Sequence, residues 1–144
     1  MKKIFALISF LICFKLYALD LGLYDSTLRL SIELTNATTA KRELMVENMN
    51  GKIYTLAGRV SDALKDERGY YIIIEPVKYV KSNIYLDNEY NIDWGASTGE
   101  VHFKVYVNKE TIKKYDQYDN IEILSTIEKL VLNNRRYYVE AKEK

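Results

Sequence analysis

The spacing of apolar residues along the chain changes at Gly51. Residues 37–48, just before it, are rich in Ala, Lys, Arg, Glu, Leu and Met, which all favour helix formation. Asn36 is a good N-cap for this segment, and Asn50 followed by a glycine is a typical helix end. The pattern therefore predicts a helix over residues 37–48 that ends before Gly51.

The segment Leu28–Leu34 alternates apolar and polar residues without a break, which is the period of a half-buried strand. It stands apart from the other strand-like segments, and Leu30, Leu34 and Ala37 would also fall on one side of a helix. We predict a strand for Leu28–Leu34 and keep a helix as the alternative.

After Gly51 the chain has the pattern of strands and turns. Asp66–Gly69 is a turn sequence and predicts a hairpin between the first two strands. Gly58 interrupts the first strand, where a bulge or a sharp bend is expected. Pro76, the only proline, limits the second strand. The five predicted strands are Ile53–Val60, Tyr70–Glu75, Val101–Val107, Asn120–Leu132 and Arg135–Ala141.

Three shorter segments connect or end these strands. The polar insertion 81–99 holds Trp94 and two tyrosines, which is compatible with an extra hairpin. A short helix of two turns is expected over Lys109–Tyr115, and Lys142–Lys144 is expected to be a frayed tail. The strand order therefore places one short helix between the third and fourth strands.

Five strands with a helix in that position is the arrangement of the five-stranded Greek-key barrel called the OB-fold. Tyr54–Val60 and the following Glu67–Tyr70 resemble the opening of exported OB domains often described as tRNA-anticodon-like. Tyr115–Ile123 resembles the turn that leads such a barrel's helix into its fourth strand, although those domains commonly have a glycine where this chain has Tyr118. The resemblance covers about residues 51–141. It implies a mainly β fold, an OB-like barrel preceded by an N-terminal helix, and it leaves the ligand open.

The first eighteen residues, Met1–Ala18, have the pattern of a secretory signal. Two lysines precede an eleven-residue run that is apolar except for one serine, and Ala18 is a small residue at the expected cut. Such a run spans roughly 16 Å as a helix, about half of the bilayer's hydrocarbon core, so cleavage is favoured over a retained anchor. The alternative is lipidation at Cys13, but the residue before it, Ile12, is bulkier than lipoprotein signals prefer.

Cleavage would change the charge of the chain. The signal carries three lysines and no acid, so 18 basic and 20 acidic residues remain and the net charge becomes −2 instead of +1. Nucleic-acid binders usually have a net basic domain, so this balance argues against nucleic acid as the partner. Cleavage also removes the only cysteine. The remainder is expected to form one domain, with an N-terminal segment 19–50 and a barrel 51–144, and no transmembrane segment.

The sequence offers little for catalysis or for metal binding. His102, the only histidine, is expected on the outward side of a strand with a partly exposed ring, and without a second histidine a zinc site is improbable. The usual phosphate-loop and serine-nucleophile motifs are absent. Asp87–Gly95 places oxygen ligands on alternate residues, as calcium loops do, but Ile92 and Thr98 stand where glycine and glutamate are required. We therefore predict no catalytic residue, metal or cofactor.

A binding face on the barrel is the stronger functional hypothesis. Alternate apolar residues of the first and third strands are expected to point into the core, namely Tyr54, Leu56, Val60, Phe103, Val105 and Val107. The period of two then places cations and aromatic rings on the outer face, where they suit stacking on bases or sugars. The alternative is that these are ordinary cross-strand pairs on a solvated sheet. The candidate ligand-binding residues are Arg59, Tyr71, Trp94, His102, Lys104 and Tyr106.

A second basic and aromatic cluster, Arg135–Tyr138, is less specific because the period of two sends its two arginines to opposite faces. Together these features predict an exported, non-enzymatic binding module of the periplasm or cell envelope that recognises an envelope protein or a glycan. The alternatives are a single-stranded oligonucleotide-binding OB domain, a structural envelope scaffold without a ligand, and, least favoured, a hydrolase.

Overall fold

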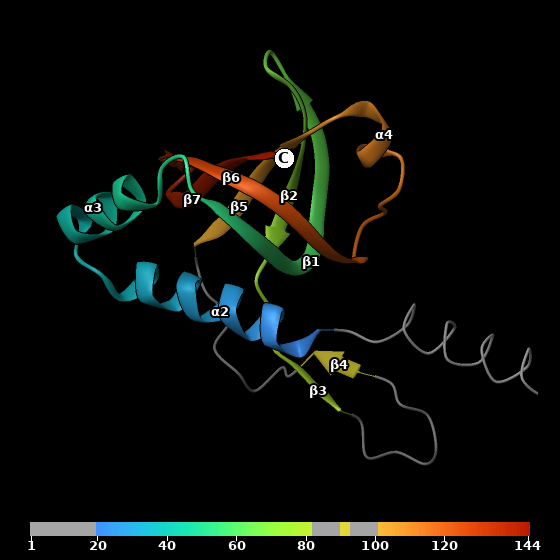
Figure 1. Cartoon of the computed structure of the whole chain (residues 1–144), viewed down its shortest axis with the longest axis horizontal. Helices are drawn as coiled ribbons and strands as arrows, with labels where there is room; N and C mark the ends of the chain where they lie inside the picture. Colours follow the sequence, from blue (N-terminus) through green and yellow to red (C-terminus); the bar gives the residue numbers. More distant parts are fainter. Residues whose placement is uncertain (1–19, 82–89, 93–100) are drawn as a thin grey trace, which may run out of the picture.

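The computed structural model describes residues 20–81, 90–92 and 101–144 and shows a five-stranded barrel with helices packed around its outside (Figure 1). The barrel closes in the order β1-β2-β5-β7-β6, with only β5 and β7 parallel. A short helix, α4 (Lys109–Ile112), connects the third and fourth barrel strands. This is the Greek-key order of an OB barrel, so the predicted fold class is confirmed. The barrel strands are β1 (Ile53–Asp66), β2 (Gly69–Glu75), β5 (His102–Val107), β6 (Asn120–Asn133) and β7 (Arg136–Glu143).

Alternating side chains of the strands fill the barrel. Val60, Ile72 and Phe103 are fully buried there, as the period of two predicts for inward positions. Leu34 and Val46, which both lie in the helices before the barrel, belong to the same core. The inward positions of the first and third strands are therefore predicted correctly.

Gly58 marks the point where β1 changes its partner. Ile53–Arg59 pairs with β6, whereas the rest of β1, from Arg59 onward, pairs with β2. A Cβ atom at Gly58 would lie 2.4 Å from the backbone oxygen of Glu75, so only glycine permits this approach. The bulge expected at Gly58 lies instead between Val60 and Asp62.

The segment Leu28–Leu34 is helical, so its predicted strand is wrong and the alternative is right. It belongs to α2 (Leu21–Asn36), which buries Tyr24, Thr27, Leu28, Ser31 and Leu34 on one face. These positions recur every three or four residues, which is the helical period. The alternation of apolar and polar residues is a local pattern and wrongly indicated a strand. The helix is favoured because it places the residues that contact the barrel on one face.

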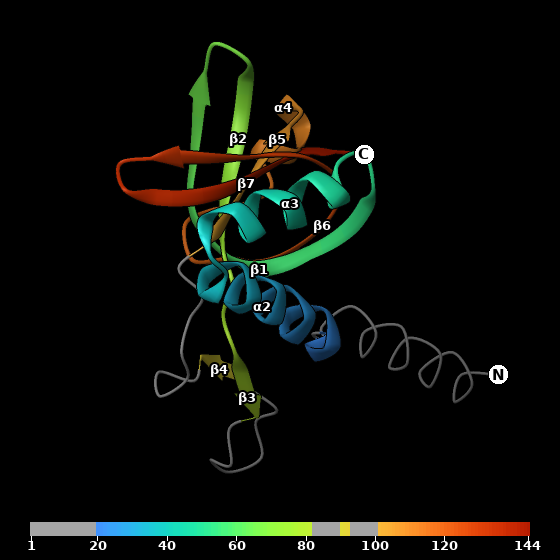
Figure 2. The same ribbon diagram turned by 90° about the vertical axis from the view of Figure 1, so that its left-hand side faces the viewer.

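Two hydroxyl groups fix α2 on the barrel. Thr27 Oγ1 accepts a hydrogen bond from the Ala57 N–H at 2.9 Å, and Ser31 Oγ donates to the Val101 carbonyl at 2.5 Å. Beside them the rings of Tyr24 and Tyr79 meet edge to face at 4.9 Å. Figure 2 shows α2 and the next helix, α3 (Thr39–Met49), lying together along one side of the barrel.

The predicted N-cap of α3 lies two residues too early. Asn36 is the last residue of α2, and Thr38 occupies the N-cap position of α3. The side chain of Arg42 donates to the carbonyls of Leu34, Thr35 and Ala37, which satisfies the open end of α2. The helix end at Asn50 and Gly51 is as predicted, with Gly51 at φ 75°.

The end of the chain is ordered as a strand, so the predicted frayed tail is wrong. β7 runs to Glu143, whose carboxylate accepts hydrogen bonds from the Asn108 N–H at 3.0 Å and the Thr111 hydroxyl at 2.5 Å. The Lys144 N–H donates to the Leu124 carbonyl at 3.0 Å. Helix α4 is also shorter than predicted, with four residues in place of seven.

Part of the predicted insertion forms the expected hairpin. β3 (Tyr79–Lys81) and β4 (Tyr90–Ile92) pair antiparallel in a separate two-stranded sheet. Trp94, the rest of the insertion and the predicted signal Met1–Ala18 lie outside the described residues. Among the described residues, no helix is both long and apolar enough to cross a bilayer.

The close approach at Gly58 gives a stability prediction. Gly58→Ala is expected to lower the free energy of unfolding by about 2–3 kcal/mol, because the new methyl group overpacks against the backbone of Glu75. Gly51→Ala is the matched control, since its Cβ meets nothing within 4 Å and only the positive φ costs about 1 kcal/mol. Urea unfolding of both variants measures the difference; equal losses would contradict the close approach.

Candidate binding face of the barrel

Three of the candidate residues converge on the outer face of β2 and β5. The rings of Tyr71 and Tyr106, paired across the two strands, have centroids 5.6 Å apart. Lys104 Nζ lies 4.3 Å from the Tyr71 ring centroid and 5.1 Å from that of Tyr106. We call Tyr71, Lys104 and Tyr106 the tyrosine face. Its cation and rings form the aromatic and basic grouping that the alternation predicts.

Carboxylates that the sequence reading missed neutralise the tyrosine face. Asp66 accepts hydrogen bonds from the Tyr106 hydroxyl at 2.7 Å and from Lys104 Nζ at 3.2 Å. Glu140, buried opposite Lys104 on β7, lies 3.5 Å from the same Nζ. Asp66 and Glu140 could be placed on the outer face from the period of two of their strands, but nothing else in the sequence pairs them with Lys104.

Ionisation of this group is mutually stabilised. The hydrogen bond from Tyr106, assisted by Lys104, lowers the pKa of Asp66 below its usual range. Burial disfavours the charge of Lys104, but its hydrogen bonds with Tyr106 and Asp66 outweigh that effect and raise the pKa of Lys104. Both groups are therefore charged at neutral pH.

Arg68, in the turn between β1 and β2, covers one end of the tyrosine face. Its guanidinium lies 4.0 Å from the Tyr106 ring centroid and pairs with Glu128 at 2.7 Å and Glu140 at 3.1 Å. The hydrogen bond with Glu128 raises the pKa of Arg68. Through these contacts Arg68 connects the β1–β2 turn to β5, β6 and β7. The surface around it offers aromatic rings together with balanced charges.

Arg59 lies at the other end of β2. It pairs with Glu75 at 2.6 Å, and its guanidinium is 5.4 Å from the ring centroid of Tyr118. Tyr118 is exposed and has φ 72°, a left-handed conformation that favours glycine. This conformation explains why OB domains commonly have a glycine where this chain has a tyrosine.

His102 is buried, so the predicted exposed imidazole is wrong. Its Nδ1 lies 3.2 Å from an Arg136 guanidinium nitrogen, and its ring meets the edge of Tyr138 at 6.3 Å. Burial, reinforced by the charge of Arg136, lowers the pKa of His102 to about 4, although Glu75 opposes this. His102 is therefore neutral at pH 7 and accepts the hydrogen bond from Arg136.

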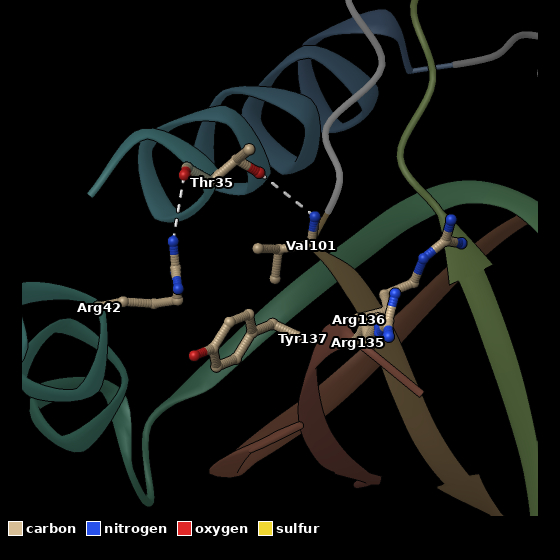
Figure 3. Close-up of a pocket in the computed structure, with 6 residues that line it drawn as sticks. All are labelled: Thr35, Arg42, Val101, Arg135, Arg136 and Tyr137. Atoms are coloured by element: carbon tan, nitrogen blue, oxygen red, sulfur yellow. Dashed lines mark hydrogen bonds between the residues drawn. The ribbon is translucent and has the colours of Figure 1, made fainter. Parts of the chain in front are cut away.

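A pocket of about 210 Å³ lies between the end of α2, the start of α3 and the β6–β7 turn (Figure 3). Figure 3 shows Tyr137 between Arg42 on one side and the two neighbouring arginines on the other. We call this the arginine pocket. It is lined by Thr35, Arg42, Val101, Arg135, Arg136 and Tyr137.

The two arginines of the β6–β7 turn share this pocket instead of pointing to opposite faces. Arg135 is not in the strand: Asn134 and Arg135 have φ 49° and 64°, so the pair forms the turn and the period of two does not apply. Arg42 was not identified from the sequence, because its helix gives no signal that it faces a turn about 90 residues later.

The described residues hold no group of three or more His, Cys, Asp or Glu that could bind a metal ion. The calcium-like stretch Asp87–Gly95 lies mostly outside the described residues. Trp94, the remaining candidate residue, is outside them as well. The described part of the site is therefore built from tyrosines, arginines, a lysine and their carboxylate partners.

The lowered pKa of His102 predicts a loss of stability in mild acid. Below about pH 6.5 the unfolded chain binds a proton at this histidine, whereas the folded chain binds it only near pH 4. Stability is thus full above pH 6.5, and the free energy of unfolding falls by up to about 3 kcal/mol as the pH drops to 4. Urea unfolding across this range measures the slope.

His102→Gln is the control for that slope, because an amide oxygen can accept from Arg136 without titrating. Since this is the only histidine of the chain, the variant is expected to have a nearly flat profile between these pH values. An unchanged slope in the variant would assign the loss to other groups.

No family model and no curated protein matches the sequence. Among solved structures, the chain is similar to a small single-stranded DNA-binding protein from Streptomyces coelicolor, with 13% sequence identity and a TM-score of 0.34. The match covers 67% of this chain and 90% of the other. A likeness at this level carries no argument about function, so the assignment to the OB-fold rests on the strand order of the barrel itself.

Proposed function

We propose that this chain is a non-enzymatic OB module that binds single-stranded nucleic acid along the outer face of β2 and β5. The observation that carries the proposal is the tyrosine face, where two rings and a lysine lie together on the second and third barrel strands. These strands and the adjoining turns form the oligonucleotide-binding and oligosaccharide-binding surface of OB barrels.

The local charge supports nucleic acid more than the net charge does. The net charge of −2 expected after cleavage argues against such a partner, but a ligand meets only the residues near it. The turn between β6 and β7 adds Arg135 and Arg136, and neither forms an ion pair among the described residues. An uncompensated basic turn beside a tyrosine face combines the two features typical of single-strand binders.

The ligand would lie along the strands. Bases stack on Tyr71, which is half-buried, and Lys104 and Arg68 hold the backbone beside it. The six residues of β5 span roughly 20 Å, which is close to the length of three or four nucleotides. Because every base has a π face, this mode predicts little sequence preference.

The balance of charge at the tyrosine face supports a second candidate, an envelope protein or glycan. Asp66 and Glu140 compensate Lys104 and Arg68, and a near-neutral, tyrosine-rich surface is typical of protein interfaces. Such a partner would bind with weak dependence on salt. The proposal includes export directed by Met1–Ala18 and membership of the tRNA-anticodon-like OB domains, so either ligand would be met outside the cytoplasm.

Binding of a fluorescent oligothymidine by the cleaved protein tests the proposal. Affinity is expected to fall about tenfold between about 50 and 200 mM salt, because two or three phosphates are neutralised by cations. Tyr71→Ala is expected to weaken binding about tenfold through loss of stacking, whereas Tyr71→Phe keeps the ring and the affinity. Fluorescence anisotropy measures both effects.

Leu124→Ala is the matched control, because Leu124 is exposed on β6, where β6 pairs with β1. It is expected to bind the oligonucleotide like the parent protein. No binding at low salt would overturn the proposal and favour the protein or glycan partner, which a pull-down from the envelope with Tyr71→Ala as comparison would identify.

A further inference from the structure

We propose that the arginine pocket is a subsite for a phosphomonoester group. The inference rests on the proposed function, for which this group is the terminal phosphate of the bound strand. The pocket lies at the β6–β7 turn, next to β5, and Arg136 links it to His102 on the outer face. A strand lying along β5 toward its first residue would therefore end at this pocket.

The charge of the arginine pocket distinguishes it from the tyrosine face. Three guanidinium groups line it, and no acidic side chain does among the residues that the structure describes. On the tyrosine face, by contrast, Lys104 is matched by Asp66 and Glu140. Planar arginines in the absence of carboxylates are the common means of binding phosphate.

Arg42 is preorganised for such a ligand. Its Nε and one terminal nitrogen donate to the carbonyls of Leu34, Thr35 and Ala37 at 2.6–3.1 Å, and its guanidinium lies 4.3 Å from the Tyr137 ring centroid. The side chain is thus fixed before any ligand arrives, so little rotamer entropy remains to be lost on binding.

Arg136 is held from the opposite side. One of its terminal nitrogens bonds His102, which is neutral and therefore orients the guanidinium without adding charge. The outer donors of Arg136 are directed by a buried ring and not by a competing carboxylate. Two arginines of the pocket are therefore fixed by uncharged partners.

Arg135 provides an independent indication of function. It occupies the second central position of a turn in which both central residues have positive φ, and glycine is strongly preferred there. A non-glycine residue in this conformation costs about 1 kcal/mol or more. A strained residue that places a cation at a pocket points to a functional role for that cation.

The size and charge of the pocket favour a terminal phosphate over an internal one. About 210 Å³ is below the range of pockets that enclose whole ligands, so it suits a single group. A phosphomonoester carries nearly two negative charges at pH 7, whereas a phosphodiester carries one. The doubly charged group compensates three arginines better.

The test compares oligothymidines of one length with a 5′-phosphate, a 3′-phosphate or hydroxyl groups at both ends. One phosphorylated form is expected to bind about tenfold more tightly than the hydroxyl form, which corresponds to one strong charge-assisted interaction. Arg135→Gly is expected to abolish the tenfold advantage of the phosphorylated form, whereas the affinity for the hydroxyl form falls by a smaller factor, because one cation of the basic turn is lost.

Arg135→Gly also separates function from folding. Because glycine favours a positive φ, the variant is expected to be at least as stable as the parent in urea unfolding. Asn134→Gly is the matched control, since it alters the same turn and retains the guanidinium, so it should keep the preference for phosphate. Loss of that preference in both variants would overturn the role of Arg135.

The remaining outcomes separate this inference from the proposed function. Equal affinity for phosphorylated and hydroxyl ends would overturn the phosphate subsite and leave single-strand binding in place. A rise in melting temperature with inorganic phosphate that Arg135→Gly abolishes, without binding of any oligonucleotide, would support the pocket and overturn the proposed function. Absence of both effects would overturn both.

Discussion

The architecture depends on the close contact of two backbones at Gly58. There β1 leaves β6 and begins to pair with β2, so one strand of fourteen residues serves both sides of the barrel. The absence of a Cβ lets the Glu75 carbonyl approach, which closes the barrel. Closure places Arg59 beside Glu75 and brings the outer faces of β2 and β5 into one surface.

Once the barrel is closed, its outer surface divides into two regions of different charge. At the tyrosine face, Asp66 and Glu140 compensate Lys104, and Glu128 and Glu140 compensate the adjacent Arg68. In the arginine pocket, the partners of Arg42 and Arg136 are carbonyl groups and a neutral imidazole. Uncharged partners orient an arginine and leave its charge available, so the pocket attracts anions more strongly than the face does.

Two turns at the barrel surface contain residues in a strained backbone conformation. Tyr118 and Arg135 both adopt left-handed conformations in which glycine would be more stable. One places an exposed ring beside Arg59, and the other places a cation at the arginine pocket. In both turns a large side chain stands where backbone stability alone would select a glycine.

Local sequence pattern was sufficient to identify the five strands, the hairpin at Asp66–Gly69 and the inward positions of Phe103 and Val60. These follow from a period of two and from turn residues, which act between neighbours in the chain. The grouping of Tyr71, Lys104 and Tyr106 was predictable for the same reason, because cross-strand neighbours share a phase.

Tertiary structure alone decided the rest. Leu28–Leu34 is a helix because its buried residues meet the barrel, and His102 is buried because Arg136 and Tyr138 from another strand cover it. The arginine pocket unites Arg42 with a turn about 90 residues away, which no local period can reveal. Sequence by itself therefore determined the strands and their phases, whereas packing between distant segments determined which outward residues are covered, neutralised or left available to a ligand.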